Sequence, residues 1–299
     1  MERQTKNKQV SDTQSSKMNR FIPHCLNDTV FFYATKLEKC HDLTWSVDVD
    51  PSSCLVSMAA NTEGLPTVND LREGSLLKTV EDDRIIYQGK ILLSSGIILT
   101  VNDKILMLLR DDEAPVDPLK WTSAAGRCDR EPFLTALKEF YEEVILFDGV
   151  SGQPVFVIFP ENDYLEEAKE IYRTTLARKG FQHPVAEWVF INADFDRHNS
   201  SLLQQVRTRF ASGEITGDGA PEVFTDMFFP FMDEENNTLE LRLLASVSIP
   251  VNTEAQLAFC DGEYKRTVKL FTVENFMRME DSSLVGMMSY YRREALSSK

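Results

Sequence analysis

Three glutamates on one predicted helix have the spacing in this chain that is best suited to chemistry. Glu139, Glu142 and Glu143 stand at positions i, i+3 and i+4, so their carboxylates lie next to one another on the helix surface. Like charges at this spacing repel each other, and a bound divalent cation removes that repulsion. Carboxylate oxygens are preferred ligands of Mg²⁺ and Mn²⁺, so the cluster predicts a site for one of these ions.

A glycine-containing turn precedes the helix and is suited to phosphate. Its sequence is Ala124-Ala125-Gly126-Arg127, which offers backbone N–H groups and a guanidinium to phosphate oxygens. Trp121, a few residues upstream, is a candidate for stacking on a base, with a place in the core or the pocket wall as the alternative. We therefore expect Gly126, Arg127 and Trp121 to bind substrate, and a metal next to them would make a diphosphate-cleaving site.

The same helix also has a purely structural interpretation. Its apolar stripe consists of Phe133, Leu137, Phe140 and Val144. The glutamates would then form a solvated face, which Lys138, four residues before Glu142, could partly neutralise without a metal. A scaffold protein in which the acidic helix is only a surface is therefore an alternative.

The segment 124–146 resembles the signature of the Nudix hydrolases, in which a glycine turn and a glutamate precede a helix reading R-E-hydrophobic-x-E-E. Here the helical part is Lys138-Glu139-Phe140-Tyr141-Glu142-Glu143, which keeps the three glutamates and the hydrophobic position. The stretch Trp121–Arg127 resembles the W-x-x-P-A-G-R approach that is common in the family. Two strands predicted at 96–110, around an Asn-Asp turn, complete the family's order of elements.

The sequence also departs from the family pattern. Lys138 stands where the family has arginine, and Ile145 stands where a glycine usually follows the helix. The stretch between Gly126 and Lys138 is shorter, so matching Glu131 to the family's first glutamate requires deletions. These departures favour, as the alternative function, a catalytically inactive Nudix-fold protein that binds nucleotides or has a regulatory role.

The resemblance implies a role for each matched residue. Glu142 and Glu143 would be the main metal ligands, and Glu139 would be a further ligand that acts as the catalytic base or positions it. Lys138 would hold Glu131 by an ion pair, less rigidly than arginine because lysine lacks the bidentate fork. The implied activity is a Mg²⁺- or Mn²⁺-dependent pyrophosphohydrolase.

A later acidic residue completes the implied site. In the family, the loop that carries it precedes the last strand and helix, which are predicted here at 267–272 and 273–279. The candidates are Glu254, Asp261 and Glu263. Of these we expect Glu263 to be the metal ligand or base.

The expected substrate is a nucleoside diphosphate linked to another group. The A-G-R form of the turn resembles the one in pyrophosphatases of ADP-ribose and dinucleotides, which favours these over nucleoside triphosphates. The formal charge of −15 and the lack of a basic track weigh against nucleic acid as a partner. A small nucleotide is therefore the expected partner, and the oligomeric state stays open.

The composition favours a cytoplasmic globular protein. No apolar run is long enough to cross a bilayer, and the polar N-terminus has no signal-peptide core. The five cysteines are scattered without a C-x-x-C pair, which fits reduced thiols better than a disulfide framework or a zinc site.

The predicted fold is a Nudix-type α/β/α sandwich around a mixed sheet. Residues 1–20 are expected to be a disordered tail, 21–83 an N-terminal extension or small domain, and 84–299 the Nudix domain. Within it, about 150–222 is predicted to be an inserted α/β segment, either a lid over the pocket or a packing extension. The acidic helix is expected over 132–146, and a hairpin is expected from strands at 223–232 and 239–249.

Overall fold

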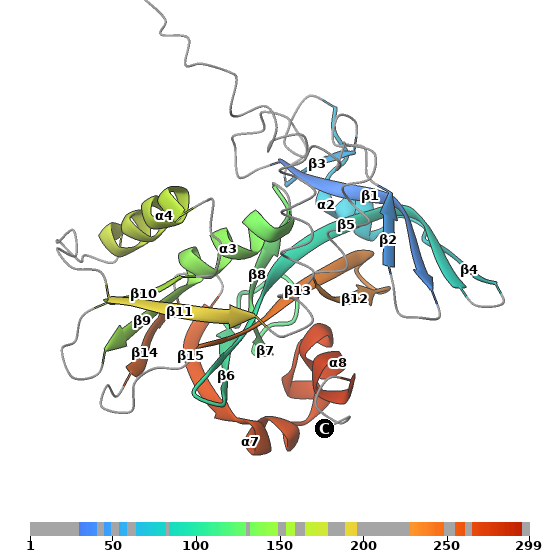
Figure 1. The fold of residues 1–299 in the computed structure, drawn as a ribbon. Coiled ribbons are helices and arrows are strands. Elements are labelled where there is room, and N and C mark those ends of the chain that lie inside the picture. Colours follow the sequence, from blue (N-terminus) through green and yellow to red (C-terminus); the bar gives the residue numbers. More distant parts are fainter. Residues whose placement is uncertain are drawn as a thin grey trace, which may run out of the picture.

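The computed structural model describes residues 30–40, 45–48, 54–58, 64–81, 84–129, 132–148, 154–158, 165–178, 189–195, 228–247, 255–260 and 265–294. The predicted tail at 1–20 lies outside these ranges. The described residues form a large mixed sheet flanked by helices, which confirms the predicted α/β class (Figure 1). Among these residues, no helix is both long and apolar enough to cross a membrane.

The main path of the sheet mixes parallel and antiparallel neighbours. In spatial order its strands are β14 (Ala255–Cys260), β9 (Val144–Asp148), β10 (Pro154–Ile158), β11 (Val189–Phe195), β13 (Thr238–Val247), β5 (Arg84–Val101), β1 (Val30–Cys40) and β2 (Trp45–Asp48). The pairs β10–β11 and β5–β13 are parallel, and the other pairs on this path are antiparallel.

Strand β5 is the strand around which the elements of the site are assembled. It pairs with β4 (Leu77–Glu81) and β1 in its first half, with β8 (Ala124–Arg127) in its second half, and with β6 (Lys104–Arg110) at its end. Strand β13 pairs with the second half of β5 on the side opposite β8. The N-terminal strands β1 and β4 are therefore hydrogen-bonded to the same strand as the glycine segment β8.

Alternate residues of β5 face two separate hydrophobic cores. Ile97 and Leu99 lie in a core with Phe140 of α3 (Pro132–Glu143), whereas Ile98 lies in a core with Phe276 of α7 (Val273–Met277). Successive side chains of a strand point to opposite faces, so both faces of the sheet need helices. Figure 1 shows α3 and α4 (Leu165–Arg178) on one side, and α7 and α8 (Gly286–Glu294) on the other. The predicted α/β/α layering is confirmed.

Both predicted hairpins are present. Asn102 and Asp103 join β5 to β6 with φ of 44° and 61°, the left-handed conformation that two-residue hairpin turns require. Strand β12 (Phe229–Asp233) pairs antiparallel with β13, and the turn between them ends at Asn237, whose φ is 47°. Strands β7 (Trp121–Thr122) and β15 (Lys265–Thr272) both pair with β6.

Short elements lie before and after this central part. Strand β3 (Leu55–Ser57) pairs with β1, and α2 (Val68–Arg72) begins at an N-terminal cap formed by Thr67. A 3₁₀ turn at Asp281–Ser283 precedes α8. The cap on α2 consists of reciprocal hydrogen bonds between Thr67 and Asp70, so this short helix has a defined start.

A strand–helix–strand unit follows the acidic helix. Strands β10 and β11 are parallel, and α4 is the crossover that such a connection requires. The unit places β10 and β11 between β9 and β13 in the sheet. The rest of the predicted insertion, from 196 onward, lies outside the described residues.

The acidic helix is shorter than the sequence predicted. It was expected over 132–146, but α3 ends at Glu143 and β9 begins at Val144. The first two residues of β9, valine and isoleucine, are β-branched and favour a strand, and this strand pairs with both β14 and β10. Ile145, at the position of the family's glycine, is consequently a fully buried strand residue.

Candidate functional site

A cleft of about 470 Å³ lies between α3, β8, the β12–β13 hairpin and the ends of α2 and β6. It is within the range of volumes that small-molecule sites occupy. Its lining contains Gly126, Arg127, Lys138, Glu139, Glu142 and Glu143. The structure therefore brings together most of the residues that the sequence predicted for one site.

Helix α3 is fixed above β8 at both its start and its apolar face. The buried Ser95 of β5 donates its hydroxyl to the carbonyl oxygen of Pro132 at 2.6 Å. Phe133, Leu137 and Phe140 are buried in the core beneath the helix. Because this apolar face is buried in the core, the glutamates at 139, 142 and 143 lie on the part of the helix that lines the cleft.

The carboxylate of Glu139 lies directly against Gly126. A Cβ atom at position 126 would stand 2.2 Å from the Cδ of Glu139, which is far inside van der Waals contact. Glycine at this position is therefore what gives the Glu139 carboxylate room against β8. This pair of residues is one of the contacts between β8 and α3.

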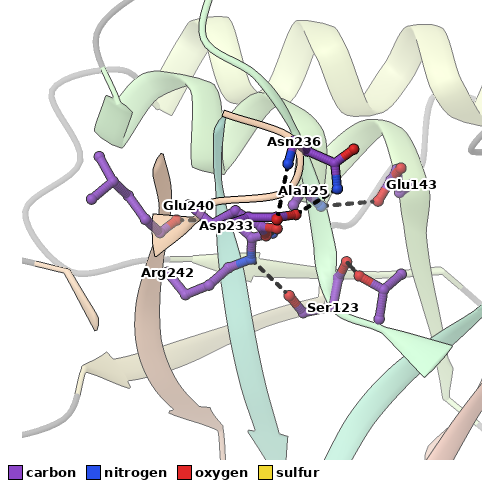
Figure 2. A network of polar contacts seen from close by, with 9 residues as sticks. Ser123, Ala125, Glu143, Asp233, Asn236, Glu240 and Arg242 are labelled. Carbon is purple, nitrogen blue, oxygen red and sulfur yellow. Dashed lines mark hydrogen bonds and ion pairs between the residues drawn. The ribbon is translucent and has the colours of Figure 1, made fainter. Parts of the chain in front are cut away.

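Glu143 is also tied to β8. Its side chain is nearly buried, with 7% of its surface exposed, and its Oε2 accepts the backbone N–H of Ala125 at 3.2 Å (Figure 2). One of the N–H groups expected to bind phosphate thus binds a carboxylate in this state. The pairing holds Glu143 close to the edge of β8.

The neighbouring charged side chains perturb the carboxyl of Glu139. Burial, then the charge of Glu143, and more weakly that of Glu142, raise the pKa of Glu139 to about 8, although Lys138 opposes the shift. The raised pKa favours the protonated form of Glu139 at neutral pH in the metal-free chain. A cation bound between the carboxylates would take the place of that proton.

Lys138 forms a buried ion pair with Asp129. Its Nζ donates to Asp129 Oδ2 at 2.8 Å, and the two side chains are only 10% and 6% exposed. Glu131 was the predicted partner of Lys138, and it lies outside the described residues. Asp129 was missed because its position depends on the path of the chain between β8 and α3.

The wall opposite α3 consists of charged residues that the sequence analysis did not name. Arg242 donates through Nε to Ser123 Oγ at 3.0 Å and forms an ion pair with Glu240 (Figure 2). Nearby, Asn236 Nδ2 donates to Asp233 Oδ2 at 2.8 Å. A signal was present: Glu240 and Arg242 alternate with the leucines of β13 and must share the opposite face of that strand.

One predicted residue among those described, Trp121, does not line the cleft. The ring of Trp121 packs edge-on against Phe271, with centroids 4.8 Å apart, in the core beneath α7 and α8. Trp121 is absent from the described lining of the cleft. Glu263, like Glu254 and Asp261, lies outside the described residues, so its role stays a prediction.

The donor set suits a divalent cation, although it is not preassembled. Across the described ranges, no three His, Cys, Asp or Glu side chains converge as a metal site. Glu139 and Glu143 are nonetheless hard oxygen donors, and the charge of Glu143 helps to raise the pKa of Glu139. A cation between them would remove this repulsion and draw on Glu142, which lines the same cleft.

Comparison with known proteins gives distant likenesses only. No family model and no curated protein matches the chain. Similar solved structures include a NUDIX-family hydrolase from Clostridium perfringens (11% identity, TM-score 0.35, covering 70% of this chain and 97% of that one), the MutT protein from Methanosarcina mazei Go1 (10%, 0.34, 70% and 96%) and a C. elegans Ap4A hydrolase (13%, 0.34, 69% and 96%). These neighbours are Nudix hydrolases, but TM-scores this low carry no argument about the function of this chain.

Proposed function

We propose that this chain is a Nudix-type pyrophosphohydrolase that depends on Mg²⁺ or Mn²⁺. Its substrate would be a nucleoside diphosphate linked to another group, of the ADP-ribose or dinucleotide type. The observation that carries the proposal is the contact of Glu139 with Gly126 next to Glu143, inside a cleft that also holds several arginines. This arrangement combines carboxylates for a cation with guanidiniums for phosphate.

Each residue near α3 has a part in the proposed reaction. Glu142 and Glu143 would hold the cation, and Glu139 would hold it or accept the proton of the attacking water. When bound, Mg²⁺ or Mn²⁺ supplies charge neutralisation of the diphosphate and acidifies water. In the reaction, the oxygen of water would bond to one phosphorus and lose its proton to Glu139, and the bridging P–O bond would break, so that each product keeps one phosphate of the cleaved diphosphate.

The remaining residues would position the substrate and the helix. Arg127 lines the cleft beside Gly126 and would contact the phosphates. Lys138, through its ion pair with Asp129, would hold the start of α3 in place. Glu131 and Glu263 remain predicted contributors, as the partner of Lys138 and as a late metal ligand.

A panel of substrates tests the proposed activity. The full chain would be incubated with ADP-ribose, NADH, dinucleoside polyphosphates and nucleoside triphosphates, each with Mg²⁺ or Mn²⁺. Glu143→Gln should abolish turnover, whereas the matched control Glu170→Gln, whose side chain on α4 is 72% exposed, should not. Equal turnover by the unaltered chain and Glu143→Gln would overturn the assignment.

A binding protein without turnover is the second candidate. The observation in its favour is that Glu143 Oε2 accepts the N–H of Ala125, so this carboxylate already has a protein partner. Tight nucleotide binding by calorimetry, together with no turnover across the panel, would favour this candidate over the hydrolase.

A further inference from the structure

Two arginines from outside the predicted signature line the cleft. Arg72 is the last residue of α2, and Arg110 is the last residue of β6. Both are partly buried: burial lowers the pKa of the Arg72 guanidinium, the charge of Asp233 opposes this shift, and the charge of Arg110 adds to it. The cleft therefore holds two nearby guanidiniums that do not belong to the acidic helix or the glycine segment.

The other cationic side chains of the cleft already contact partners within the protein. The guanidinium of Arg127 lies over the ring of Phe31, 5.7 Å from its centroid. Lys138 binds Asp129, and Arg242 binds Glu240 and Ser123. By contrast, the Nε atoms of Arg72 and Arg110 are buried and have no hydrogen-bond partner among the described residues.

Two acidic side chains that line the cleft, Asp233 and Asp117, also accept hydrogen bonds within the protein. Asp233 accepts the backbone N–H groups of Glu235 and Asn236 in addition to the side-chain amide of Asn236. Asp117 accepts a hydrogen bond from Lys120 at 2.6 Å. A buried donor without a partner is costly, and both arginine side chains line the cleft, so this wall favours an added acceptor.

The backbone of each arginine is held in place. Asn237 donates its side-chain amide to the carbonyl oxygens of Leu71 and Gly74, each at 2.8 Å, at the end of α2. Arg110 donates its backbone N–H to the carbonyl oxygen of Lys120 at 3.0 Å. The two guanidiniums therefore extend into the cleft from anchored positions on different elements.

We propose that Arg72 and Arg110 together bind a phosphate group of the substrate that lies beyond the scissile diphosphate. This inference rests on the proposed function and narrows its substrate class to nucleotides with a longer phosphate chain. A pair of guanidiniums matches the double charge of phosphate better than the single charge of a carboxylate, and their N–H forks suit its oxygens. A bound phosphate would also relieve the repulsion between the two cations.

Metal-free binding tests the anion site by itself. Calorimetry with the full chain in EDTA would measure the affinity for inorganic tripolyphosphate, without a cation on the glutamates. Arg72→Gln and Arg110→Gln should each weaken binding about tenfold, because each removes a charge-assisted contact. The matched control Arg278→Gln, 73% exposed and paired with Glu274 on α7, should leave binding within about twofold of the unaltered chain.

Binding that does not change in either cleft variant would overturn the proposal. Thermal unfolding would check that the variants are folded, and Arg→Lys variants at both positions should recover part of the affinity, because lysine keeps the charge but lacks the fork. A loss of affinity in Arg278→Gln equal to that in the cleft variants would also overturn it, since binding would then depend only on net charge.

Turnover separates this proposal from the proposed function. Arg72→Gln should raise KM for diadenosine tetraphosphate about tenfold and leave KM for diadenosine diphosphate within about twofold, because only the longer chain reaches the arginines. If Arg72→Gln changes KM equally for both substrates, the inferred phosphate site is contradicted, whereas the proposed hydrolase activity is not. Arginine-dependent tripolyphosphate binding without turnover of any nucleotide would support the site while the hydrolase fails.

Discussion

At the scale of single residues, the crowding of Glu139 governs the behaviour of the candidate site. Its carboxyl lies against Gly126 and near Glu143, and these surroundings keep it protonated at neutral pH in the metal-free chain. Holding an acidic side chain in such a place lowers the stability of the metal-free fold. The same crowding makes the position attractive to a cation.

The pH dependence of stability in EDTA should reveal Glu139. Between about pH 4.5, the ordinary value, and about 8, the folded chain holds a proton on Glu139 that the unfolded chain has lost. The folded state binds more protons in this window, so the contribution of Glu139 to stability must fall as pH rises and level off above about 8. The free energy of unfolding of Glu139→Gln, minus that of the unaltered chain, should therefore increase as pH rises from about 4.5 to about 8. Urea unfolding at several pH values measures this difference. Parallel pH profiles for the two proteins would contradict this account.

Gly126→Ala tests the contact between β8 and α3. The added methyl would stand 2.2 Å from Glu139 Cδ, so the carboxylate must move, at a cost on the order of 1–3 kcal/mol, and metal-dependent turnover should fall. Truncating the obstructing side chain in Gly126→Ala/Glu139→Ala should restore the stability but not the turnover. Thermal and urea unfolding measure the first quantity. If the double variant does not regain stability, the contact between residue 126 and the Glu139 side chain is not the cause of the loss.

At the scale of elements, the connection between β8 and α3 depends on the buried ion pair of Lys138 and Asp129. Asp129→Asn leaves a buried lysine without its carboxylate and should cost on the order of 3 kcal/mol in urea unfolding. The double variant Asp129→Leu/Lys138→Met removes both charges and should recover most of that loss. If the double variant is as unstable as the single one, the ion pair is not the cause.

The elements around the site show what the sequence could and could not predict. The β5–β6 hairpin and the start of α3 were predictable, since Asn102-Asp103 and Pro132 are local signals. The end of α3 was not, because Val144 and Ile145 continue the helical stripe in sequence and become strand only through pairing with β14 and β10. Local patterns specify local structure, whereas sheet partners lie far along the chain.

The same limit applies to the candidate site. The glutamates at 139, 142 and 143 share one helix, so their spacing alone predicted their proximity. Arg72, Arg110 and Arg242 come from three separate elements, and only the sheet brings them to the opposite wall. Trp121 was misplaced because its partner Phe271 is remote in sequence.

At the scale of the whole molecule, the N-terminal part and the core share one sheet, and Asn237 links α2 to the β12–β13 turn. Asn237→Gly keeps the left-handed backbone at φ 47° but removes the hydrogen bonds to the end of α2, which should cost on the order of 1–3 kcal/mol. The control Asp103→Gly changes an exposed turn position with φ 61° and should be nearly neutral. Urea unfolding compares the two. If both variants lose the same free energy of unfolding, the hydrogen bonds from Asn237 to the end of α2 do not stabilise the fold.

The central claim is that the carboxylates of α3 serve a metal-dependent cleavage of diphosphate. The most direct test is the kcat of the full chain on its best nucleotide substrate with Mg²⁺, measured for the unaltered protein, Glu143→Gln and Glu170→Gln. We expect kcat to fall at least about a hundredfold in Glu143→Gln and to stay unchanged in Glu170→Gln, with both variants folded. A kcat in Glu143→Gln equal to that of the unaltered chain would contradict it.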